Sequence, residues 1–97
     1  MPVSVVTVEI HLPGARSLKE KRRIVKSLKD RIHGRFRVSI AETALHELHQ
    51  RSELGIAAVA PDGAHLRRLG EQLRRLFDER YDIVVTRWDE RLVEDGG

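Results

Sequence analysis

Hydrophobic and polar residues alternate in four segments of the chain, a pattern typical of β-strands that bury one face. The first strand is expected at residues 3–11, where Val6, Val8 and Ile10 point to one side and the intervening residues to the other. In the last segment the run Ile83–Val85 leaves the register open, because three consecutive apolar residues fit either face. We expect the other three strands at residues 35–42, 54–60 and 81–92.

Apolar residues also recur at the three- and four-residue spacing of an amphipathic helix in a segment after the first strand. Ser17 and Glu20 have the spacing of a capping box, and Gly34 stands where a helix-ending glycine is expected. These signals predict a helix over residues 17–33. Its apolar stripe comprises Leu18, Val25, Leu28 and Ile32, with Ile24 at the margin.

A second amphipathic helix is expected at residues 63–79, with Asp62 placed to cap its first turn. The order is therefore β-α-β-β-α-β. Since every element has one apolar side, the simplest arrangement packs both helices on one face of a four-stranded antiparallel sheet and leaves the other face open. The sequence predicts an α+β, ferredoxin-like fold and a single domain over residues 1–97.

The chain contains no cysteine, which excludes disulfides, thiolate metal sites and cysteine nucleophiles and fits a reducing compartment. The apolar stretch at residues 3–8 lacks a basic leader and is too short to cross a membrane. We therefore expect a soluble, cytoplasmic protein with no membrane partner.

Positive charge is concentrated in one third of the chain. The net charge is only +3, but residues 16–37 carry ten Lys and Arg and two acidic residues. The rest of the chain carries eight Lys and Arg and thirteen acidic residues. Such asymmetry favours an anionic partner over a surface made merely to be soluble.

Most of this charge falls on one side of the first helix. Lys19, Arg22, Lys26 and Lys29 follow at i, i+3, i+7 and i+10, roughly 135° around from the apolar stripe. Each like-charged pair costs such a helix about 0.2–0.5 kcal/mol, so folding alone does not favour the pattern. The predicted nucleic-acid contacts are Arg16, Lys19, Arg22, Arg23, Lys26, Lys29, Arg35 and Arg37, with the last two on the open side of the second strand. The alternative is a solvated basic face with no ligand.

The expected partner is RNA or a ribosomal subunit, bound through its phosphates without reading bases, because lysine and arginine supply affinity more than sequence information. The strands at residues 3–11 and 54–60 contain no aromatic residue on which bases could stack. Lys21 falls in the apolar stripe, and its side chain is expected to reach solvent past the end of the sheet; the alternative is a catalytic lysine.

No constellation in the chain indicates an enzyme, and we expect neither a catalytic residue nor a cofactor. Asparagine is absent, so an acylphosphatase of the type that shares this fold is not favoured, and no carboxylate pair or glycine-rich nucleotide motif is present. His46 and His49 could share a metal on one helical turn, but ordinary surface histidines are the preferred interpretation, so no metal is expected.

A protein–protein module without a nucleic-acid role is the alternative function. The open sheet face would be unusually rich in small and apolar residues for a surface left to water, so a homodimer could form through it. The expected interface comprises Val5, Thr7, Ser39, Ala41, Ala57 and Val59, with Gly55 and Arg37 on the same face.

The run S-L-K-E-K-R-R at residues 17–23 resembles the helix opening of the YlxP-like family of small bacterial proteins. The segments F-R-V-S-I-A-E at 36–42 and L-G-I-A at 54–57 resemble the second and third strands of that family, and the resemblance covers nearly the whole chain. It implies a ferredoxin-like domain of unestablished molecular function, encoded near genes for translation factors, which by association favours RNA or ribosome binding. One departure is His49, which stands where the family often has a tryptophan.

Overall fold

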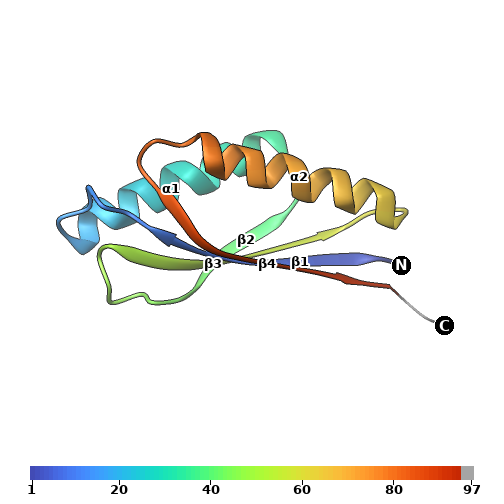
Figure 1. Ribbon diagram of the computed structural model, residues 1–97, viewed down its shortest axis with the longest axis horizontal. Helices are drawn as coiled ribbons and strands as arrows, with labels where there is room; N and C mark the ends of the chain where they lie inside the picture. Colours follow the sequence, from blue (N-terminus) through green and yellow to red (C-terminus); the bar gives the residue numbers. More distant parts are fainter. Residues whose placement is uncertain (95–97) are drawn as a thin grey trace.

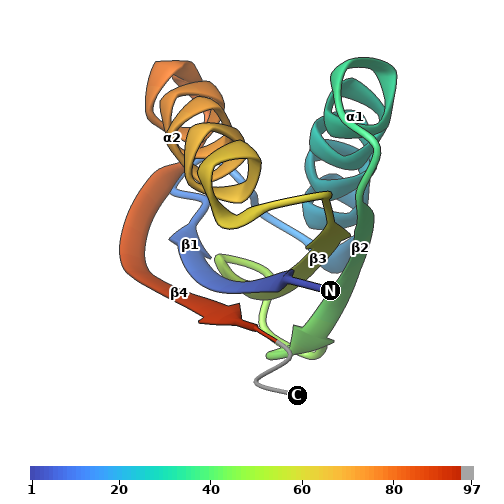
Figure 2. The ribbon, with the colours of Figure 1, turned by 90° about the vertical axis from the view of Figure 1, so that its right-hand side faces the viewer.

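The computed structural model of the protein describes residues 1–94 and contains the expected elements in the expected order (Figure 1). The elements are β1 (Val3–His11), α1 (Leu18–Arg35), β2 (Ser39–Ala44), β3 (Arg51–Val59), α2 (Gly63–Glu79) and β4 (Val84–Val93). The strands pair in the order β2-β3-β1-β4, and every pairing is antiparallel. Both helices lie on one face of this sheet (Figure 2), so the predicted ferredoxin-like α+β fold is confirmed.

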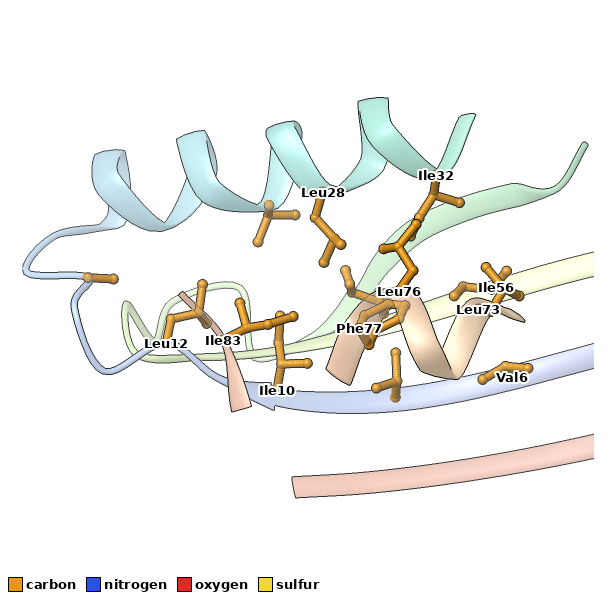
Figure 3. Packing of buried hydrophobic residues seen from close by; sticks show 14 residues of the cluster. Val6, Ile10, Leu12, Leu28, Ile32, Ile56, Leu73, Leu76, Phe77 and Ile83 are labelled. Atoms are coloured by element: carbon orange, nitrogen blue, oxygen red, sulfur yellow. The ribbon is translucent and has the colours of Figure 1, made fainter. Parts of the chain in front are cut away.

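The core lies between the sheet and the two helices (Figure 3). The alternation predicted for β1 is confirmed, because Val6, Val8 and Ile10 are buried beneath the helices. Burying one such side chain contributes about 1.5–3 kcal/mol relative to leaving it exposed, so this layer is the main source of stability. The helices supply Val25, Leu28 and Ile32 from α1 and Leu66, Leu73, Leu76 and Phe77 from α2.

The end predicted for the first helix is wrong. Gly34 lies within α1, and no glycine among residues 1–94 has a positive φ. The helix continues to Arg35, and the backbone N–H of Phe36 closes its last turn by donating to the carbonyl of Ile32 at 2.8 Å. A glycine ends a helix only where the chain must turn through the left-handed region, and here it leaves in an extended conformation.

The predicted bounds of α2 are confirmed, whereas those of three strands shift. β2 begins at Ser39, although Phe36, Val38 and Ile40 face the core as predicted. β3 begins already at Arg51, so that it pairs with β1 along its whole length. β4 begins at Val84, and the register left open in the sequence is set by an irregularity opposite Glu9 and Ile10 of β1.

The molecule is elongated, with extents of 47 × 21 × 19 Å. The two helices are antiparallel and offset: α1 begins at one end of the molecule, α2 begins at the other, and only their C-terminal parts lie side by side (Figure 1). Neither helix in the described part of the chain has an apolar stretch long enough to cross a bilayer.

Candidate nucleic-acid interface

The helix α1 is fixed at its N-terminus by a cap that the sequence anticipates. The Ser17 hydroxyl oxygen accepts a hydrogen bond from the backbone N–H of Glu20 at 3.1 Å, and the Glu20 carboxylate in turn accepts one from the backbone N–H of Arg16. Two donors at the helix end are thereby satisfied. Because α1 then packs Val25, Leu28 and Ile32 on the sheet, its opposite side is turned to solvent.

We call the five basic residues on that outer side the basic band; they are Lys19, Arg22, Arg23, Lys26 and Lys29. Four of them are exposed and Lys29 is half-buried, while Arg16 is exposed just ahead of the helix. Lys26 forms an ion pair with Asp30 at 2.8 Å, and this hydrogen bond and the opposite charge raise the pKa of Lys26. The other four band residues have no acidic partner among residues 1–94, so the band keeps most of its positive charge uncompensated.

Two of the predicted contact residues lie away from this band. Arg35 is not on the second strand: it belongs to the last turn of α1, where its guanidinium carbon lies 5.5 Å from the ring centre of Phe36. Arg37 precedes β2 and lines a hollow on the open sheet face with Val3 and Val59. Arg35 lies on the side of α1 that faces α2, and Arg37 lies beyond the end of the helix, so neither shares its outer side.

Lys21 does not reach solvent as the sequence suggested. Its side chain is 1% exposed, and its ammonium lies 2.9 Å from a carboxylate oxygen of Glu42. The same Nζ atom donates to three backbone carbonyls, those of Leu45 and His46 at 2.9 and 3.2 Å and that of Arg51 at 3.2 Å. We call this arrangement the lysine cage. An ammonium surrounded by four acceptors is neither free to act as a nucleophile nor available to a ligand.

The lysine cage joins α1 to the segment between β2 and β3. Glu42 also accepts a hydrogen bond from the Ser52 hydroxyl at 2.6 Å. Burial works to raise the pKa of Glu42, but the bonds from Ser52 and Lys21 and the positive charge of Lys21 hold that pKa below its ordinary value. The connection is also shaped by Leu45, whose φ of 64° places its carbonyl in a conformation that few residues with a side chain adopt. The cage therefore sets where the N-terminal half of α1 sits.

The six residues predicted for a protein interface share the open face of the sheet. Val5, Ala57 and Ser39 face one another across β1, β3 and β2, and Thr7, Gly55 and Ala41 form the next row. Val59 is 61% exposed and Val5 is 38% exposed. Next to them, the small side chains of β2 and β3 leave shallow hollows of about 450 and 260 Å³. The residues are brought together as predicted, while their role stays a prediction.

A cleft that the sequence did not reveal lies between the C-terminal parts of the two helices. It has a volume of about 310 Å³ and is lined by Arg31, Arg35, Leu76, Glu79, Arg80 and Tyr81. The sequence separates the two groups of residues by more than forty positions, and only the antiparallel offset of the helices brings them together. The one feature of the sequence that could have indicated this cleft is Tyr81, an aromatic residue that belongs to no apolar stripe.

His46 and His49 do not form a metal site with acidic neighbours in the structure. The Nε2 atom of His46 lies 3.1 Å from the backbone oxygen of Glu42. Across residues 1–94, no three histidine, aspartate or glutamate side chains gather as metal ligands would.

A family model described as a protein of unknown function, DUF503, matches residues 3–90 of the chain. The chain belongs to the DUF503 family. It is 46% identical over 72 residues to the uncharacterized protein YlxP of Bacillus subtilis (strain 168), an alignment that covers 74% of this chain and 78% of that protein. The resemblance to the YlxP-like family is thus confirmed, and the family description assigns no molecular function.

Proposed function

We propose that this DUF503 protein binds structured RNA, alone or within a ribosomal subunit, through the basic band of α1 and Arg16. The observation that carries the proposal is the band itself. Five basic residues share the outer side of one helix, and only Lys26 has an acidic partner among residues 1–94. Such a helix repels itself, and phosphates relieve that repulsion. We place this activity in the cytoplasm.

The band would contact the backbone of the RNA and leave its bases unread. The five side chains span residues 19–29, a helical length of about 15 Å, which suits several successive phosphates. Ion pairs to phosphates supply affinity and position but little sequence information. The open sheet face offers no aromatic platform either, because neither β1 nor β3 contains an aromatic residue.

The test is binding of the purified protein to ribosomal subunits and to a structured RNA over a salt series. In the test variant Lys19, Arg22, Lys26 and Lys29 are changed to glutamine. In the matched control Arg51, Arg67, Arg87 and Arg91 are changed to glutamine, which removes the same charge from α2 and the sheet. We expect the test variant to bind much more weakly and its log–log salt slope to shrink by about 0.7–0.9 per charge removed, while the control stays close to wild type.

Two results would reject the proposal. Binding that does not weaken between low and high salt would show that phosphate contacts do not carry it. Equal losses in the test and control variants would show that only net charge matters and that the band is not a site.

A second candidate function is an interface between two copies of the chain through the open sheet face. The exposed Val59 and Val5 lie beside the hollows over β2 and β3, so one copy offers both projections and recesses to the other. A two-fold interface places a patch against the same patch of the second copy, so a patch with charges of one sign would repel itself. The border of this face carries both positive and negative charges, whereas two copies of the basic band would repel each other. The border residues are Glu9, Glu53, Asp89, Arg37, Arg51, Arg87 and Arg91.

Sedimentation equilibrium decides between one copy and two. We expect a dimer at micromolar concentrations for the wild type and a monomer for Ala57→Glu, which places a charge in the centre of the face. A wild-type monomer at high micromolar concentration would reject the interface and leave the RNA proposal untouched.

A further inference from the structure

The cleft between α1 and α2 has the size of a small ligand site. Its volume of about 310 Å³ lies at the lower end of the range for pockets that hold small molecules. The helices diverge above the sheet (Figure 2), and the cleft lies where their C-terminal parts run side by side. A ligand there would touch α1 through Arg31 and Arg35 and α2 through Leu76 and Glu79.

The cleft is positively charged. Three arginines line it against the single acidic residue Glu79, and one of them, Arg80, is held by Asp82 in a two-bond ion pair at 2.9 and 2.7 Å. Arg31 has no acidic partner in the described part of the chain. Both helices end here, and their dipoles disfavour an anion by a fraction of a charge each, so Arg31 and Arg35 are the groups that make the site attractive to one.

The rim of the cleft carries an aromatic ring that packs on nothing. Tyr81 is 98% exposed, whereas Phe77 is buried and Trp88 lies edge-on against it with ring centres 5.5 Å apart. An exposed ring beside arginines is the combination that single-stranded nucleic-acid sites use, because bases stack on the ring while guanidinium groups hold the phosphate.

The cleft is also within reach of the basic band. Arg31 follows Lys26 by five residues, which is about 7.5 Å along the helix axis and about 140° around it. It lies on the flank of α1 that faces α2, while the band covers the outer side. A duplex lying across the band would therefore have the cleft around the side of α1, where a nucleotide extruded from the duplex could enter it.

We propose that this cleft holds one unpaired nucleotide of the bound RNA, with its base stacked on Tyr81 and its phosphate on Arg31 and Arg35. The proposal rests on the RNA-binding function above and adds its substrate class: duplex RNA interrupted by a bulge. The band supplies affinity for any duplex, and the cleft supplies preference for an interrupted one.

The test uses two hairpin RNAs with the same stem, one of which has a single-nucleotide bulge, and compares Kd values at fixed salt. We expect the wild type to bind the bulged hairpin about tenfold more tightly. Tyr81→Leu should lose this preference, and Tyr81→Phe, which keeps the ring, should retain it. Arg31→Gln should weaken only the bulged complex and lower its salt slope by about one charge.

The outcomes separate this proposal from the one it rests on. If the wild type binds neither hairpin, the RNA-binding function itself fails. If it binds both equally, or if Tyr81→Leu keeps the preference, the cleft proposal is overturned while the basic band stands. If adenosine monophosphate alone binds with comparable affinity and shifts the Tyr81 ring signals, the ligand is a free nucleotide and the assignment to RNA is wrong. Because Tyr81 makes almost no contact with the fold, unchanged Trp88 fluorescence is expected in both Tyr81 variants.

Discussion

Replacing Lys21 by methionine should destabilise the protein by about 3–5 kcal/mol, the usual loss when one partner of a buried ion pair is removed. Methionine matches the four-atom apolar stem of lysine and lacks only the terminal ammonium, so the change isolates that group. Without it, Glu42 retains only Ser52 as a donor, the carbonyls of His46 and Arg51 lose the ammonium, and the Leu45 carbonyl keeps only the backbone N–H of Leu48. Each buried acceptor left unpaired costs about 1–3 kcal/mol, although the Glu42 side chain is 18% exposed and water can reach part of the cage. We therefore expect the lower end of the range.

The measurement is urea unfolding followed by far-ultraviolet circular dichroism and by the fluorescence of Trp88, the one tryptophan of the chain. A domain of this kind has a total stability of about 5–15 kcal/mol, so the expected loss moves the midpoint far outside experimental error. Lys19→Met serves as the control, because Lys19 is exposed on the same helix and should change stability by no more than about 0.5 kcal/mol.

A double-mutant cycle tests the physical reason. In Lys21→Met with Glu42→Leu no buried carboxylate is left unpaired, so the double variant should be about 1–3 kcal/mol more stable than Lys21→Met alone. Two results would refute the reasoning: a loss below about 1 kcal/mol for Lys21→Met, or a double variant no more stable than the single one. Either would mean that water replaces the ammonium at little cost.

Three further changes test other parts of the structure. Ser17→Ala removes the α1 cap and should lower the free energy of unfolding by about 1 kcal/mol in the same urea experiment, whereas Ser17→Asp should keep most of that stability. An unchanged stability of Ser17→Ala would show that the cap does not stabilise the fold. Gly70→Ala places a methyl group against the present position of a Glu90 carboxylate oxygen, but that exposed end can swing away and alanine favours the helix, so stability should stay level or rise by up to about 1 kcal/mol; a clear loss would show that Glu90 is held in place. Burial raises the pKa of Glu42, but the hydrogen bonds from Ser52 and Lys21 and the positive charge of Lys21 outweigh it, so folding lowers this pKa; folding also lowers the pKa of Asp82, chiefly through the hydrogen bond from Arg80. Groups with a lowered pKa stabilise the fold above their unfolded pKa of about 4, so stability should fall as the pH drops below about 5, and less steeply in Glu42→Gln; a pH-independent midpoint between pH 5 and 3 would contradict this.

Local periodicity was enough to predict the six elements, because each depends on which side of a helix or strand is apolar. The bounds of α2 and the caps at Ser17 and Asp62 also followed from the sequence, since a cap is a contact between residues three positions apart. The exposure of the basic band followed in the same way: residues opposite an apolar stripe have nowhere to lie but in solvent.

The tertiary structure alone decided the features that depend on distant partners. Lys21 is buried because carbonyls and a carboxylate 21 to 30 positions away converge on it, and no local pattern encodes that convergence. The register of β4 depends on an irregularity against β1, about 80 residues earlier in the chain. The cleft at Tyr81 exists only because two helices lie offset on one sheet. Periodicity determines which side of an element is buried, whereas the partners of buried polar groups depend on how the elements meet in space.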